Sequence, residues 1–190
     1  MKESRRTRIF RALVPLSFAV ALLASGCAQK VPYHHQGQEG VYTLTNLHPD
    51  EVRARLYSVN YQQRGLIPVC TPVRIEKVSN QEMRFTRLDT GQPYQYVFHN
   101  AVREPIPVHL DKYFGTECPD LEAMSGVDAE GIEQARVMEG MSKQAVILAI
   151  GYPPSHETPS LDHDVWKYWK NKFDTFLVHF QDGRVVRIQD

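Results

Sequence analysis

Short runs of alternating apolar and polar residues dominate the chain between residues 41 and 114. Residues 82–88 alternate, residues 89–91 (Asp-Thr-Gly) form a turn signal, and residues 94–98 alternate again. Alternation with a period of two is typical of strands that are buried on one face. Residues 41–114 are therefore predicted to form a small strand-rich module that resembles a half-barrel.

Residues 140–190 change to a helical pattern that is followed by strands. Ser142 is placed to cap a helix whose apolar stripe includes Val146, Gly151 can end that helix, and Pro153 prevents it from continuing. Three strand patterns follow the helix, at residues 165–170, 175–181 and 184–189. The pair Asp182–Gly183 is a tight-turn signal between the last two of them.

Residues 115–139 are predicted to be an acidic connector that contains a first helix. They hold seven acidic residues and a single basic residue, and such a run is most simply a solvated surface. Ser125 and Asp128 can form a capping box for a helix that runs to Val137. Two helices followed by a three-stranded antiparallel sheet predict a two-layer sandwich, so the predicted fold class is α+β.

Side-chain alternation separates the two faces of the predicted carboxy-terminal sheet. Trp166 and Tyr168 face the apolar stripe of the helix, and Phe180 joins them from the next strand. Trp169 lies on the opposite face, and a large aromatic residue on a solvent-facing sheet surface often marks an interface. The alternative is that the acidic segment or the first module covers Trp169. The candidate interface residues are Lys167, Trp169, Leu177 and His179.

The amino terminus has the pattern of an export signal. A basic leader precedes the apolar residues 13–23, and the small residues 24–26 (Ala-Ser-Gly) precede Cys27. Small residues directly before a cysteine resemble the lipobox of bacterial lipoproteins. The resemblance implies cleavage after residue 26 and lipidation of Cys27, and an ordinary secretory signal is the alternative. Because Ala28 follows the cysteine where an aspartate would favour the inner membrane, the resemblance implies the periplasmic face of the outer membrane.

Removal of this signal changes the charge balance. The chain has 22 basic and 22 acidic residues, and the signal holds five and one of them, so the remaining 164 residues carry a net charge of −4. A mildly acidic chain argues against nucleic-acid binding, which normally requires a basic surface. The chain is 42% hydrophobic and 23% charged, as globular proteins are. No apolar run reaches the roughly 18 residues of a membrane-spanning helix.

Two cysteines remain after Cys27 in a chain that is predicted to reach an oxidising compartment. An even pair there most simply forms one disulfide, between Cys70 and Cys118. The alternative is two unrelated buried thiols. A zinc site at the cysteines is not predicted, because no histidine stands at ligand spacing from either of them.

Two histidine-containing segments are candidates for metal or catalytic sites, and neither predicts one. Residues 27–40 are polar and contain glycine, so they are predicted to be a lipidated tether. His34 and His35 on such a tether lack fixed geometry and further ligands. Residues 162–164 (Asp-His-Asp) lie in a proline-containing loop and are most simply a solvated turn. No metal or cofactor is therefore predicted.

Two resemblances to known families extend this interpretation. Residues 68–73 (Pro-Val-Cys-Thr-Pro-Val) resemble the Pro-x-Gly-Thr-x-Val pattern of bacterial SH3-like domains, with Cys70 in the glycine position. Residues 130–190 resemble the SmpA/OmlA family of BamE-like lipoproteins. The residues that carry the second resemblance are Gly140, Met141, Ser142, Val146, Gly151, Pro153, Trp166, Tyr168, Phe180 and Gly183.

Membership of the SmpA/OmlA family would imply a non-enzymatic protein that is anchored in the outer membrane and acts in envelope assembly or maintenance. Its partners would be membrane lipid, through Cys27, and a periplasmic or outer-membrane protein. The alternatives are a module that binds peptidoglycan or another periplasmic protein, and an inhibitor of a periplasmic enzyme. Enzyme activity is not predicted, because the sequence has no G-x-S-x-G, H-E-x-x-H, phosphate-loop or C-x-x-C motif.

Overall fold

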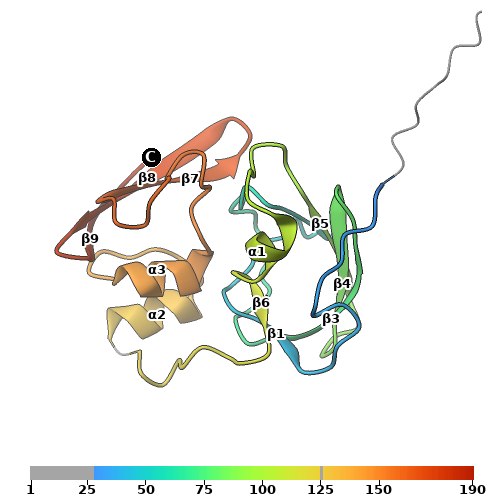
Figure 1. The fold of residues 1–190 in the computed structure, drawn as a ribbon. Coiled ribbons are helices and arrows are strands. Elements are labelled where there is room, and N and C mark those ends of the chain that lie inside the picture. The colour runs from blue at the N-terminus through green and yellow to red at the C-terminus, as the bar shows by residue number, and fades with distance from the viewer. Residues whose placement is uncertain (1–27, 125) are drawn as a thin grey trace, which may run out of the picture.

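The computed structural model describes residues 28–124 and 126–190, which form a six-stranded sheet, a three-stranded sheet and three helices (Figure 1). The elements are β1 (Val41–Thr43), β2 (Arg55–Tyr57), β3 (Pro72–Val78), β4 (Glu82–Arg87), β5 (Pro93–Val97), α1 (Ile106–Leu110), β6 (Phe114–Gly115), α2 (Val127–Glu133), α3 (Lys143–Ile150), β7 (Val165–Asn171), β8 (Asp174–Gln181) and β9 (Arg184–Gln189).

Strands hold far more of this fold than helices do. They account for 34% of it and helices for 12%, because the three helices have only five, seven and eight residues. The prediction of an α+β chain with a two-helix, three-strand sandwich is therefore wrong: the protein is mostly β, with a curled six-stranded sheet beside a three-stranded one. Part of the difference lies in α2, which ends at Glu133 and not at Val137. Ala135 adopts a left-handed backbone with φ of 51°, which an α-helix does not tolerate. The predicted cap Ser125 lies outside the described residues.

The six-stranded sheet has the strand order β2-β5-β4-β3-β1-β6, in which only the β2–β5 pair is parallel. Alternate residues of the long central strands form its apolar core. A β-bulge between Ile75 and Lys77 shifts this alternation by one residue, so that Val78 faces the core and Lys77 faces solvent. The fully buried side chains of β3 and β4 are Val73, Ile75, Val78, Met83 and Phe85.

The segment before β1 packs against this sheet, which corrects the prediction of a tether at residues 27–40. The Gln29 backbone N–H donates to the Asn80 side-chain oxygen, and the Asn80 backbone N–H donates to the Gln29 carbonyl oxygen. The Val31 backbone N–H donates to the Val78 carbonyl oxygen at 3.1 Å. Tyr33 is only 6% exposed and belongs to the core of the first sheet. The polar composition of the segment conceals this one aromatic anchor, whose burial and backbone pairing hold the segment in place.

The three-stranded sheet packs its buried face against α2 and α3 (Figure 1). The Ser142 hydroxyl caps α3 by accepting a hydrogen bond from the Ala145 backbone N–H at 3.2 Å. At the turn between β8 and β9, Asp182 and Gly183 both have positive φ, as a tight hairpin requires. The last strand differs from simple alternation, because a bulge lets Val185 and not Val186 face the core.

Two buried asparagines join the first sheet to the end of α3. The Asn46 side-chain amide donates to the carbonyl oxygens of Ile132 and Ala149 at 2.8 and 3.1 Å. The Asn60 amide donates to the Ile150 and Tyr152 carbonyl oxygens, both at 2.8 Å. The last carbonyls of a helix have no partner within the helix. Side chains from the segments that follow β1 and β2 satisfy them here, so the ends of α2 and α3 are docked against the six-stranded unit.

Candidate functional site

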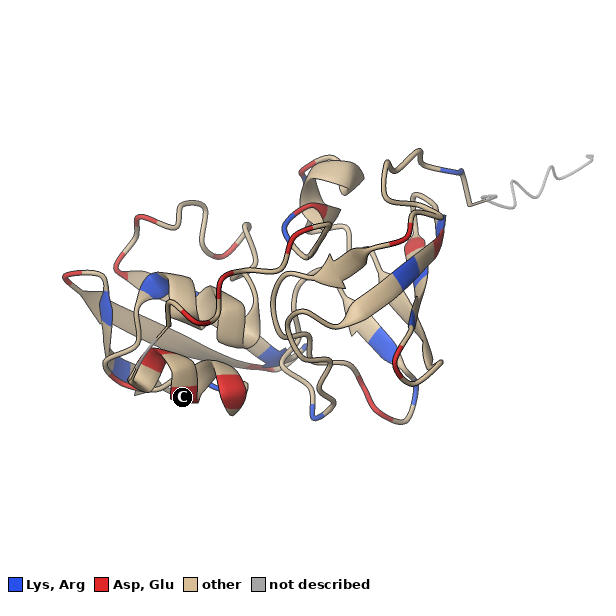
Figure 2. Ribbon diagram, turned by 90° about the horizontal axis from the view of Figure 1, so that it is seen from below, with Lys and Arg blue, Asp and Glu red and all other residues tan. Residues whose placement is uncertain are grey.

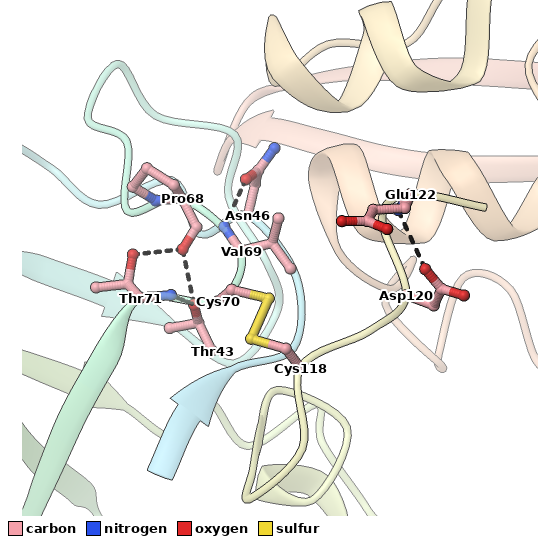
Figure 3. The surroundings of a disulfide bond; sticks show 9 residues. All are labelled: Thr43, Asn46, Pro68, Val69, Cys70, Thr71, Cys118, Asp120 and Glu122. Carbon is pink, nitrogen blue, oxygen red and sulfur yellow. Dashed lines mark hydrogen bonds between the residues drawn. A yellow bond between two sulfur atoms is a disulfide. The ribbon is translucent and has the colours of Figure 1, made fainter. Parts of the chain in front are cut away.

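Cys70 and Cys118 are joined by a disulfide, with their Cα atoms 5.3 Å apart (Figure 3). Cys70 has φ of 63° and stands at the third position of a turn in which the Thr71 N–H donates to the Pro68 carbonyl oxygen. Glycine is the usual residue at such a position, which agrees with its place in the SH3-like sequence pattern. The Thr43 hydroxyl also donates to the Pro68 carbonyl oxygen, at 2.7 Å, and holds the turn against β1.

The disulfide connects the turn before β3 to the segment that follows β6 (Figure 3). This segment is the first part of the acidic connector, and it leads to α2. The bridge therefore fixes the point at which the chain leaves the first sheet. Cys27, the predicted lipidation site, lies outside the described residues. Within residues 28–124 and 126–190, no helix is long and apolar enough to cross a bilayer.

The acidic connector is mostly solvated where the structure describes it, and acidic residues colour α2 in Figure 2. Glu130 and Glu133 of α2 are exposed. Asp128 differs, because its carboxylate accepts a hydrogen bond from the Ser142 backbone N–H at 2.7 Å and so supports the start of α3. The charge of this segment therefore belongs largely to an open surface and in one place to helix capping.

The residues that carry the SmpA/OmlA resemblance occupy structural positions. Met141, Val146, Trp166, Tyr168 and Phe180 are at most 5% exposed and form the centre of the second core. The glycines at 140, 151 and 183 have positive φ, Ser142 caps α3, and Pro153 is buried. None of these side chains forms an accessible site, so they shape the scaffold on which a site must stand.

Trp169 lies at the junction between the two units and not on an open surface. The Gln62 backbone N–H donates to the Trp169 carbonyl oxygen at 2.9 Å, and Tyr61 forms a β-bridge with Trp169. The indole N–H is buried and has no hydrogen-bond partner among the described residues. The first module therefore pairs with the backbone of Trp169, and His156 and the Lys167 ammonium group of the second unit lie beside its ring.

The remaining predicted interface residues lie on the face of the three-stranded sheet that points away from α2 and α3. Cross-strand pairing aligns two rows on this face, Val165–His179–Arg187 and Lys167–Leu177–Gln189. Val165 is 43% exposed, and Leu177 and His179 are partly exposed. We call these six residues the outer face. It combines two apolar side chains with basic and polar neighbours, as protein interfaces do.

A cleft of about 540 Å³ separates α3 from the segment between α1 and Cys118. Two lysines line it, and both hold the chain together. The Lys143 ammonium group donates to the carbonyl oxygens of residues 161, 162 and 163 at 2.9 to 3.1 Å. Lys112 is paired with Glu104 at 2.6 Å. The cleft therefore offers no free cation from these two residues, and we assign no ligand to it.

A buried polar chain connects α1 to β5. The His109 ring is bonded to the Tyr96 hydroxyl at 2.9 Å and to the Glu104 carboxylate at 2.8 Å, and Lys112 holds the second carboxylate oxygen. The hydrogen bond from His109, assisted by Lys112, lowers the pKa of Glu104 to about 2. The cavity beside His109 is about 10 Å³, and Glu104 also lines a cavity of about 410 Å³ on the side of Phe98 and Ile106. This arrangement stabilises the packing of α1.

The lowered pKa of Glu104 predicts acid sensitivity. Its ionised form is favoured in the folded protein, so this contribution to stability is present above the ordinary glutamate pKa of 4.5 and is lost as the pH falls from 4.5 to about 2. We expect Glu104→Gln to remove this part of the pH dependence, as measured by thermal unfolding at pH 7 and pH 3. Exposed Glu122 is the matched control, and Glu122→Gln should behave as the wild type. Equal acid sensitivity of wild type and Glu104→Gln would contradict the prediction.

The sequence did not indicate this polar chain, since His109 appears as one of several scattered histidines. Glu104 and Lys112 flank α1 on either side of His109, and no regular helical spacing in the sequence marks the three residues as a group. The other histidine-containing cluster in the sequence, residues 162–164, forms no group of potential metal ligands in the described chain.

Comparison of the chain with protein-family models, curated proteins and solved structures found no match.

Proposed function

We propose that this protein is a lipid-anchored, non-enzymatic protein of the bacterial outer membrane that faces the periplasm and binds another envelope protein, in outer-membrane assembly or maintenance. The observation that carries the proposal is the outer face of the three-stranded sheet. Val165 and Leu177 are accessible on a sheet whose other face packs mostly against α2 and α3. Accessible apolar residues on a rigid sheet offer a partner a surface that needs no rearrangement.

The surroundings of these apolar residues support a protein as the partner. Lys167, His179 and Arg187 border them, and Lys167 is paired with Glu157 at 3.0 Å at the sheet edge. Apolar contact area with a charged border is typical of transient protein interfaces. The basic border favours a partner surface that carries acidic groups beside an apolar patch.

Two features support the compartment. The lipobox resemblance at Cys27 implies export and lipidation, and the Cys70–Cys118 pair is placed as a disulfide in an oxidising space would be. In cell fractionation, the Cys27→Ser chain should therefore appear in the soluble fraction, because it lacks the acyl chains that hold the wild type on the membrane.

The partner can be identified by photo-crosslinking in cells. We expect a photoreactive amino acid at position 165 to capture one envelope protein, and we expect Leu177→Asp to abolish this capture by placing a charge on the outer face. The matched control is Val52→Asp, since Val52 is 96% exposed in the other unit. That control should leave capture unchanged.

The captured molecule decides between functions. An outer-membrane assembly protein would support the proposal, whereas a single periplasmic enzyme or a cell-wall fragment would overturn it in favour of an inhibitor or a peptidoglycan-binding module. If Leu177→Asp and Val52→Asp change the yield of captured protein equally, the outer face is not the binding surface. Thermal unfolding of each variant would show whether the substitution disturbs the fold.

A further inference from the structure

His34 and His35 occupy the two central positions of a β-turn. The Gln36 backbone N–H donates to the Tyr33 carbonyl oxygen at 3.0 Å, which closes the turn. The turn is held on both sides, because Tyr33 is buried in the first core and the Gly37 N–H donates to the Ile75 carbonyl oxygen at 2.8 Å. The two imidazoles therefore project from a fixed backbone, which the sequence pattern of this segment does not indicate.

A third potential ligand comes from a distant part of the chain. Asp111 caps the end of α1 and faces the turn, and its carboxylate oxygen lies 3.4 Å from His34 Nε2. One ligand atom from each of His34, His35 and Asp111 falls within 4.8 Å of the others. Two atoms bound to one tetrahedral zinc ion are about 3.3 Å apart, given bond lengths of 2.0–2.2 Å. The spacing of His34 and Asp111 already matches this value.

Neighbouring residues orient the three side chains. His35 Nδ1 lies 2.8 Å from the Gln38 side-chain oxygen, which can only accept a hydrogen bond, so Nδ1 is the donor and Nε2 is the ring nitrogen left to face a metal ion. Metal-binding histidines usually have such a partner on the second ring nitrogen. The buried Tyr33 hydroxyl has no hydrogen-bond partner at standard geometry in the described chain. Burial, and after it the nearby Asp111 carboxylate, raise the pKa of this hydroxyl.

We propose that His34, His35 and Asp111 bind one divalent transition-metal ion of the zinc type. Two imidazoles and one carboxylate suit Zn²⁺, Cu²⁺ or Ni²⁺, whereas Ca²⁺ and Mg²⁺ require oxygen ligands. His34 and Asp111 are exposed, so water can complete the coordination. The bound ion would connect the segment before β1 to the end of α1, and Tyr33 and Gln38 would be positioning residues.

The test is a titration of the full chain, produced in detergent without a histidine tag, with Zn²⁺ in a calorimeter. We expect one ion per chain, and an affinity at least tenfold weaker in each of His34→Ala, His35→Ala and Asp111→Asn. Gln38→Ala should also weaken binding, by about tenfold, because loss of a second-layer hydrogen bond typically costs 10- to 100-fold. His163→Ala is the matched control, since it removes an exposed histidine outside the cluster, and it should leave the affinity unchanged.

Co²⁺ provides an independent readout of the ligands. Its absorption spectrum should indicate nitrogen and oxygen ligands without the charge-transfer band of a thiolate, which excludes binding by a free Cys27. The same spectrum should be lost in Asp111→Asn. The proposal is overturned if the wild type binds no Zn²⁺, if a thiolate band dominates, or if binding persists unchanged in His34→Ala and Asp111→Asn. Thermal unfolding without metal should be the same for wild type and variants, since the substituted side chains are at or near the surface.

Discussion

Removal of the disulfide between Cys70 and Cys118 should lower the free energy of unfolding by about 4 kcal/mol. The bridge closes a loop across a sequence separation of 48 residues, and its main effect is to restrict the unfolded chain. The bridge also fixes the segment that leads to α2, so its loss should loosen the connection between the two sheets. Urea unfolding of wild type and Cys70→Ala/Cys118→Ala, followed by circular dichroism, measures the difference.

The backbone at Cys70 supplies a sharp control for this experiment. Its φ of 63° is costly for every residue with a side chain, so Cys70→Gly/Cys118→Ala should be about 1 kcal/mol more stable than Cys70→Ala/Cys118→Ala. This difference separates the effect of the turn from the effect of the bridge. Peptide mapping of protein isolated without reductant should find the Cys70–Cys118 link. Two free thiols, or equal stability of wild type and both double variants, would contradict the prediction.

Trp166→Ala should destabilise the second unit by about 3–5 kcal/mol, the usual range for a buried aromatic side chain that is truncated to alanine. Trp166 has 0% exposure, and its ring lies 4.6 Å from the Phe180 ring. The Lys143 ammonium group lies 5.6 Å from the Trp166 ring, so the substitution also removes a cation–π contact at the start of α3. The unfolding free energy of the full chain, measured in urea by circular dichroism, provides the test.

Two further variants show whether the size of this effect comes from core packing. Trp166→Phe should lower the free energy of unfolding by less than Trp166→Ala does, because it leaves a smaller cavity. It also removes a buried indole N–H that has no partner among the described residues. Trp169→Ala should also cost less, since Trp169 is only partly buried at the junction. If Trp169→Ala proved as destabilising as Trp166→Ala, the junction would be as important to stability as the second core.

The sequence predicted the elements that local signals define. Ser142, Gly151 and the Asp182–Gly183 turn each act through their own backbone geometry, and α3 and the last hairpin lie where these residues indicate. The fold class was wrong because it depended on the lengths of helices and on how strands of two- and three-residue length pair. Strands as short as β6 leave no periodic pattern, and they are defined only by their partners in the sheet.

The candidate sites depend even more on distant contacts. His34 and His35 are visible in the sequence, but the turn that fixes them is held by Tyr33, whose burial requires the assembled first sheet. Asp111 stands 76 residues after His35, at a helix end that no motif marks. Trp169 was correctly identified as lying opposite Trp166 along the strand. Sequence alternation does not reveal that its backbone pairs with Tyr61 and Gln62 of the other unit.

If Cys27 carries a lipid, the hydrogen bonds between Gln29 and Asn80 would limit how far the folded protein can move from the membrane. If Cys27 carries the lipid, only Ala28 separates it from the first residue held by the fold, so the free span is about 7 Å. The hairpin between β3 and β4 would then rest at the level of the lipid headgroups, and its orientation relative to the bilayer would be restricted. A protein on so short a connection would stay at the membrane surface. It would bind only partners that come to within one domain height of that surface.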